Sequence, residues 1–205
     1  MVGRSPYEVA LCGDLTGLHP RLVAYFSAIP VGHHGLGWGS FDTVGTPRRW
    51  LWPLLALLAR EGVLFPVWEH DVAFRVVNRP GAGLVAAVRR FDFAAGPRHM
   101  VDSISTDAEG LRDTLGRSGR METRLRARIV DEALHLDSTQ VAVRFFGRSL
   151  PVPRFCAPTV HLRESFDDLA DRQRVRLTVD LPLVGRVYEY VGSFRYSIQP
   201  GEAPS

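Results

Sequence analysis

Most of the chain after residue 70 alternates apolar and polar residues with the period of a β-strand. The alternation is clearest over 174–181, where Val175, Leu177 and Val179 share one face. Segments rich in Gly, Pro, Asn and Asp separate these runs. Strands joined by such short turns pair antiparallel, because parallel pairs need long crossovers. The pattern predicts strands over 72–78, 84–93, 98–105, 121–130, 134–145, 159–166, 172–181 and 186–198.

One segment interrupts this pattern with an unbroken apolar run from Trp50 to Ala59. Thr46 followed by Pro47 is typical of a helix start, and Gly62 of a helix end. A helix that is apolar all round has no wet face and must be covered. We therefore expect an α+β, β-rich fold in which a curved antiparallel meander sheet, barrel-like, wraps around this apolar helix.

The chain of 205 residues is predicted to form a single domain with a sizeable core. Residues 1–68 would be an N-terminal helical and loop part, with a short helix beginning near Pro20 and a glycine-punctuated loop before a short strand at 38–44. This part would pack on the antiparallel sheet of 69–198. Residues 199–205 would be a frayed tail.

Composition and charge narrow the function classes. All 25 basic residues are arginine, which excludes Schiff-base lysines and the phosphate-binding lysine of P-loops. The arginines alternate with apolar residues, as over 124–129, and no nucleic-acid-binding motif accompanies them, so no nucleic acid partner is expected. Cys12 and Cys156 lack metal-type spacing, which favours a reducing, cytoplasmic location. The apolar run is half the ~20 residues needed for a membrane span, so none is expected.

The segment Glu69-His70-Asp71 is the first candidate for chemistry. A carboxylate beside a histidine can orient it for acid–base catalysis, and neighbouring Trp68 would shift both pKa values if it enclosed them. The alternative is a polar loop whose side chains cap strand ends and pair with arginines. Both interpretations remain open.

We expect neither a metal nor a cofactor. His33 and His34 would point to opposite faces of a strand, so they seldom share one ion. Gly81 and Gly83 fit a dinucleotide fingerprint, but Asn78-Arg-Pro-Gly before them favours a hairpin, and no βαβ series follows.

The last predicted strand carries an unusual polar pattern. Tyr188, Tyr190, Phe194 and Tyr196 lie on one face, and Glu189 lies between two valines on the other. Whichever of the two faces is buried, it contains a polar group. Glu189 would be either a pocket acid that holds a ligand or one half of a bridge to an arginine on a neighbouring strand.

Four segments resemble a bacterial family of domains of unknown function that occurs alone and fused C-terminally to saccharopine-dehydrogenase-like oxidoreductases. The resemblance extends from about Leu18 to Tyr196 and assigns no activity or catalytic residues. It implies an accessory domain of bacterial secondary metabolism that works beside a separate nicotinamide-dependent oxidoreductase on a lipid-like or polyketide-like molecule. The segments are Gly45-Thr-Pro-Arg-Arg-Trp-Leu-Trp-Pro53, Gly62-Val-Leu-Phe-Pro66, Leu150-Pro-Val-Pro-Arg-Phe-Cys-Ala-Pro158 and Asp180-Leu-Pro-Leu-Val-Gly-Arg-Val-Tyr-Glu-Tyr190.

The leading interpretation is a binding module for a small apolar molecule, lipid-like or polyketide-like, in a pocket between the curved sheet and the helix. Arg49, His70 and Glu189 would be its polar contacts. The candidate ligand-binding residues are Trp38, Arg49, Trp52, Trp68, His70, Tyr188, Glu189 and Tyr190.

Two alternatives stay open. In the first, the protein is a cyclase or isomerase that uses the same pocket, with Glu69, His70 and Glu189 as catalytic groups. In the second, it is a protein-docking accessory domain of an oxidoreductase. The docking alternative predicts an exposed apolar patch near the Trp50 helix and no enclosed cavity.

Overall fold

The computed structural model describes residues 3–201. Its helices are α1 (Pro6–Ala10), α2 (Pro20–Phe26) and α3 (Trp52–Glu61), and a 3-10 turn, Arg49–Leu51, precedes α3. Its strands are β1 (His33–Gly45), β2 (Trp68–Gly81), β3 (Leu84–Phe93), β4 (Gly96–Asp107), β5 (Gly110–Leu115), β6 (Met121–Val130), β7 (Ala133–Phe145), β8 (Arg148–Pro151), β9 (Thr159–Asp167), β10 (Arg172–Leu181) and β11 (Gly185–Pro200).

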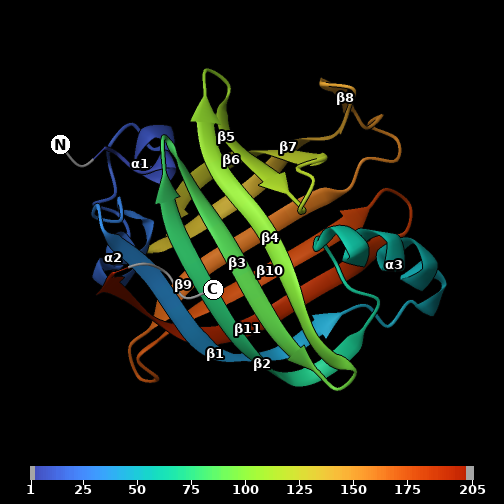
Figure 1. The fold of residues 1–205 in the computed structure, drawn as a ribbon, viewed down its shortest axis with the longest axis horizontal. Coiled ribbons are helices and arrows are strands. Elements are labelled where there is room, and N and C mark those ends of the chain that lie inside the picture. Colours follow the sequence, from blue (N-terminus) through green and yellow to red (C-terminus); the bar gives the residue numbers. More distant parts are fainter. Residues whose placement is uncertain (1–2, 202–205) are drawn as a thin grey trace.

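The strands form a closed antiparallel barrel (Figure 1). Its order is β6-β5-β4-β3-β2-β1-β11-β10-β9-β7, and pairing of β6 with β7 closes the ring. The short β8 pairs with the second half of β7, where β9 has already diverged. In Figure 1, α1 and α2 lie at one end of the barrel and α3 lies at the other. Within residues 3–201, no helix is long and apolar enough to span a membrane.

The predicted barrel-like meander is confirmed, and the bounds of β3, β6 and β10 agree with the alternation. β5 and β8 were not predicted. The glycine-punctuated loop predicted before residue 38 is the first part of the strand β1, which also contains the predicted short strand 38–44. β1 pairs with both β2 and β11. The predicted tail begins inside β11, and residues 202–205 lie outside the described residues.

The glycines of β1 resemble a loop in the sequence, but in the barrel their lack of a side chain allows close packing against β11. A Cβ atom on Gly35 would collide with the phenol of Tyr196. A Cβ atom on Gly39 would collide with the backbone carbonyl oxygen of Ser193. The alternating glycines of β1 therefore let β11 and its aromatic side chains approach closely.

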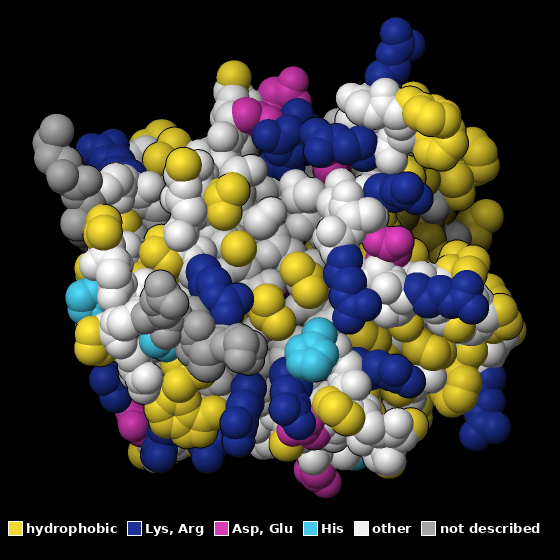
Figure 2. All heavy atoms as spheres, viewed as in Figure 1, with side chains coloured by type: hydrophobic (Ala, Val, Ile, Leu, Met, Phe, Trp, Pro, Cys, Tyr) yellow, Lys and Arg dark blue, Asp and Glu magenta, His cyan; other side chains and the backbone are white. Residues whose placement is uncertain are grey.

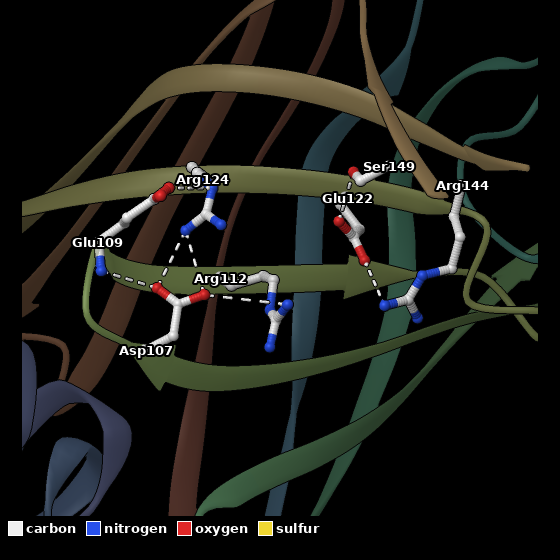
Figure 3. A network of polar contacts seen from close by, with 7 residues as sticks. All are labelled: Asp107, Glu109, Arg112, Glu122, Arg124, Arg144 and Ser149. Atoms are coloured by element: carbon white, nitrogen blue, oxygen red, sulfur yellow. Dashed lines mark hydrogen bonds and ion pairs between the residues drawn. The ribbon is translucent and has the colours of Figure 1, made fainter. Parts of the chain in front are cut away.

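The outer face of the barrel carries the arginines that the alternation placed on a wet surface. Arg124 on β6 lies 3.0 Å from Oδ1 of Asp107 on β4 (Figure 3). Glu122 lies 3.2 Å from an Nη atom of Arg144 and accepts a hydrogen bond from Ser149 at 2.8 Å. These contacts join strands β4 to β8 across the outer surface. The pair of Arg124 with Asp107 is partly exposed, and such pairs are worth about 0.2–1 kcal/mol, whereas Glu122 is buried.

The expected wrapping of the sheet around the apolar helix is not confirmed, because α3 lies at the end of the barrel. Leu51 and Leu55 are buried against the core, whereas Trp50, Leu54 and Leu57 are 61%, 54% and 58% exposed. The aromatic side chains of the strands fill much of the barrel interior beside this end. Only one stripe of the helix region is therefore covered, and an apolar surface is left facing outward.

The N-terminal helices cover the other end. The stripe predicted for the second helix is present, since Leu22 and Phe26 are fully buried. The preceding helix, α1, was not predicted, although it has a capping box formed by Ser5 and Glu8. Tyr7 on α1 packs against Phe26 and also reaches the barrel interior.

Candidate functional site

A cavity of about 130 Å³ lies inside the barrel. Tyr7 of α1 lies at its boundary, as do Val63 and Leu64 from the segment after α3. Its walls are mainly apolar and come from β3 to β7 and from β9 to β11. They include Met100, Leu125, Leu136, Leu162, Leu177 and Tyr190.

Four charged side chains line this otherwise apolar cavity: Arg89 on β3, Asp102 on β4, Asp113 on β5 and Glu164 on β9. Arg89 forms an ion pair with Asp102. Glu164 accepts a hydrogen bond from the amide of Gln173. The interior therefore holds one guanidinium and three carboxyl groups, which is an unusual content for a buried space.

The two carboxyl groups that do not pair with Arg89 differ in their hydrogen bonds. Glu164 has the amide of Gln173, whereas Oδ1 of Asp113 is buried with no hydrogen-bond partner among the described residues. A buried acceptor without a partner costs free energy, so Asp113 marks a place where a donor would be stabilised.

Burial changes the protonation of these groups. It raises the pKa of Asp113 to about 7, although the charge of Arg89 acts to lower it. Burial also raises the pKa of Glu164 to about 7, against the hydrogen bond from Gln173 and the charge of Arg89. Both carboxyl groups therefore change charge near neutral pH, where most acids are fully ionised.

These pKa values predict that stability falls as pH rises from about 4 to about 7. The folded protein keeps the protons of Asp113 and Glu164 up to about pH 7, while the unfolded chain releases them near their usual values of 3.8 and 4.5. Exposed acids with lowered pKa values, such as Asp107, add stability as pH rises, but only at about pH 4 and below.

The variant Asp113→Asn tests this linkage. We expect it to exceed the wild type in free energy of unfolding by up to about 4 kcal/mol at pH 8 and to match it at pH 4. Urea unfolding at both pH values measures the difference. An equal difference at the two pH values would contradict the raised pKa of Asp113.

Of the residues predicted to bind a ligand, Tyr190 alone lines the interior cavity. Trp38 lies exposed on β1. The guanidinium of Arg49 lies 5.6 Å from the ring centroid of Trp52, on the turn before α3. Tyr188 is buried in the main apolar cluster.

The predicted catalytic residues lie outside the cavity. The carboxylate of Glu69 accepts a hydrogen bond from the backbone N–H of Ala94 at 2.9 Å. His70 is exposed, and its Nδ1 lies 3.0 Å from the carbonyl oxygen of Asp42. Glu189 lies 3.4 Å from Arg186 on the same strand, so its arginine partner comes from within β11 and not from a neighbouring strand.

Two open hollows lie on the outside of the protein. Trp68, Tyr188 and Glu189 line a groove of about 540 Å³, so three of the predicted residues do come together there. A second cleft, of about 410 Å³, lies between α3 and the turn from β3 to β4 and is lined partly by Arg60, Arg98 and Arg117. This cleft occupies the position expected for a pocket between sheet and helix, but none of the predicted residues lines it. Figure 2 shows apolar side chains gathered on the right, where α3 lies in Figure 1.

Among residues 3–201, no group of three or more His, Cys, Asp and Glu side chains is placed to hold a metal ion.

A break in the strand alternation marks the four interior charges in the sequence. Each occupies a position where strand alternation calls for an apolar side chain: Arg89 between Ala87 and Phe91, and Asp113 between Leu111 and Leu115. Asp102 and Glu164 interrupt β4 and β9 in the same way. A charged residue at such a position is as unusual as Glu189 between two valines, so strand alternation indicates all four.

Comparison with known proteins gives one match. The family model described as "Domain of unknown function (DUF4166)" matches residues 18–194. No curated protein and no solved structure matches the chain.

Proposed function

The chain belongs to the DUF4166 family of domains of unknown function, and we propose that it is a binding module for a small, largely apolar molecule held inside the barrel. The interior cavity carries this proposal, because it combines apolar walls with a few converging polar groups. That combination is typical of small-molecule sites, and closed β-barrels commonly hold one small ligand.

The size of the cavity sets the scale of the ligand. An apolar cavity of about 150 Å³ engineered in another protein binds benzene. The interior cavity, at about 130 Å³, therefore suits a single ring or a short chain. A longer lipid-like or polyketide-like molecule would require flexible wall residues such as Met100 and Met121 to move.

The family resemblance is the basis for the proposed cellular location and partner enzyme. The domain would work in the bacterial cytoplasm, in secondary metabolism, beside a separate nicotinamide-dependent oxidoreductase. It would hold the molecule on which that enzyme acts. The proposed site needs no cofactor of its own.

An isomerase or cyclase is the second candidate, and the pKa values of Asp113 and Glu164 favour it. A carboxyl group with a pKa near 7 can both donate and accept a proton at neutral pH. In this version Asp113 and Glu164 replace Glu69, His70 and Glu189 as the catalytic groups, because only the former pair lines the cavity.

The docking alternative keeps one supporting observation. The exposed apolar patch that it predicts is present on the α3 region, at Trp50, Leu54 and Leu57. The interior cavity is a feature that this alternative does not need. It therefore ranks below the two proposals that use the cavity.

Filling the cavity tests the proposed function. Native mass spectrometry of the purified protein is expected to show an adduct released on denaturation, or toluene is expected to raise the unfolding temperature by about 3 °C at ten times its Kd. Val160→Trp, inside the cavity, should abolish either effect. Val130→Trp, on a partly exposed side chain, is the control and should retain it. A protein that shows no adduct and no response to toluene would exclude the proposal.

A further inference from the structure

We infer that the ligand carries a protonated amine, held by Asp113 and Glu164, and that the site rejects a carboxylate ligand. This inference rests on the proposed function, because it assumes that the interior cavity is the binding site. It goes further by assigning the polar group of the ligand and the residues that recognise it.

The charge balance of the cavity is the first argument. Three carboxyl groups line it against one guanidinium, and Asp102 already pairs with that guanidinium. A ligand carboxylate that bound Arg89 would have to displace Asp102 and leave it buried without a partner. It would also approach Asp113 and Glu164, so charge repulsion would oppose it whenever they are ionised.

Unused hydrogen-bond acceptors are the second argument. Oδ1 of Asp113 is buried without a partner among the described residues, and Gln173 donates to only one oxygen of Glu164. An ammonium group has three donors and no acceptor, so it complements such a surplus of carboxyl oxygens. A neutral alcohol satisfies fewer of these acceptors and leaves the charge surplus in place.

The groups around the carboxyl groups of Asp113 and Glu164 do not reverse the preference for an ammonium ligand over a carboxylate ligand. Arg89 is the cation whose charge acts on both of them. The phenols of Tyr7, Tyr25 and Tyr190 lie in the same electrostatic environment, and burial raises the pKa of each, so they stay neutral. Neutral phenols add hydrogen-bonding capacity but no positive charge.

The inference predicts a specific pH dependence of ligand affinity. The two carboxyl groups ionise near pH 7, so an ammonium ligand binds more tightly as pH rises from 6 to 8 and releases protons when it binds. A carboxylate ligand shows the opposite trend, because it binds best when the carboxyl groups are protonated. A neutral ligand changes little over this range.

Four ring compounds of matched size test the inference by calorimetry or NMR titration: toluene, benzyl alcohol, benzylamine and benzoate. We expect benzylamine to bind at least tenfold more tightly than benzoate at pH 8, and its affinity to rise about tenfold between pH 6 and pH 8. Asp113→Asn and Glu164→Gln should each reduce that rise. Asp92→Asn, on an exposed ion pair with Arg90, is the control and should leave it unchanged.

The outcomes separate the two proposals. If toluene binds but benzoate binds as tightly as benzylamine, or if benzylamine shows no pH dependence, the amine assignment is overturned and the proposed function stands. If none of the four compounds binds, both fail. A benzylamine preference that survives in the double variant Asp113→Asn/Glu164→Gln would also overturn the assignment, because other groups would then be responsible.

Discussion

Arg89→Met is expected to lower the free energy of unfolding by about 4 kcal/mol at pH 8, because it removes one partner of a buried ion pair and leaves the other unpaired. Arg89 is the cation of a cavity that also holds Asp102, Asp113 and Glu164. Methionine fills similar space but supplies no charge. The loss should be smaller at pH 5, where the carboxyl groups can be neutral. Urea unfolding at the two pH values measures both effects.

The neighbouring residue provides a matched control. Arg90 is exposed and pairs with Asp92 on the outside of the barrel at 2.7 Å, so Arg90→Met should change stability by less than about 1 kcal/mol. The double variant Arg89→Met/Asp102→Leu should recover much of the loss, because it removes both charges together. An Arg89→Met protein as stable as the wild type at pH 8 would show that the interior charges are solvated rather than buried.

Gly39→Ala is expected to lower the free energy of unfolding by at least about 3 kcal/mol, the upper end of the usual cost of overpacking. The added Cβ would meet the backbone carbonyl oxygen of Ser193, which no side-chain rotation can move away. Relief therefore requires β1 and β11 to separate locally. Thermal and urea unfolding measure the loss.

Gly3→Ala is the control, since a Cβ at that position has nothing within 4 Å. It should shift stability by less than about 0.5 kcal/mol. A Gly39→Ala protein with wild-type stability would mean that the β1–β11 contact is looser than the structure shows.

Sequence alternation predicted the strands whose inward residues are all apolar or nearly so, such as β10. It missed β5, where only Leu111 and Leu115 flank an inward Asp113 in a short segment. It also misassigned the first part of β1, residues 33–37, because glycines at the inward positions resemble a loop. In both strands, the residues that obscure the alternation point into the barrel. In β5 this residue is a charged group, and in β1 the glycines leave space for side chains of the paired strand.

The position of α3 could not be derived from its composition. An apolar segment between Trp50 and Ala59 requires cover, but periodicity does not say whether the cover is a sheet, another molecule or only a part of the surface. The barrel interior contains Phe41, Phe74 and Phe91 and the cavity, so no room remains there for a helix. Residues assigned to a pocket around that helix, such as Arg49, therefore lie on the outside.

The interior site was predictable in part. The face of the last strand that carries Tyr190 has an unusual polar pattern in the sequence, and Tyr190 does line the cavity. The partners of Tyr190 come from strands far apart in the sequence, and only barrel closure brings Arg89 close to Glu164. A single sequence shows that each charge is out of place, but it does not show that they share one space.

The pairing of β1 with β11 has a consequence for how the protein is made. Strands β2 to β7 can pair with neighbours as soon as each is synthesised, but β1 waits for the last strand before its second edge is covered. Contacts between such distant segments slow folding, because a long loop must close before they form. On the ribosome, the growing chain therefore carries an open strand edge through nearly its whole synthesis, and open edges invite association between chains.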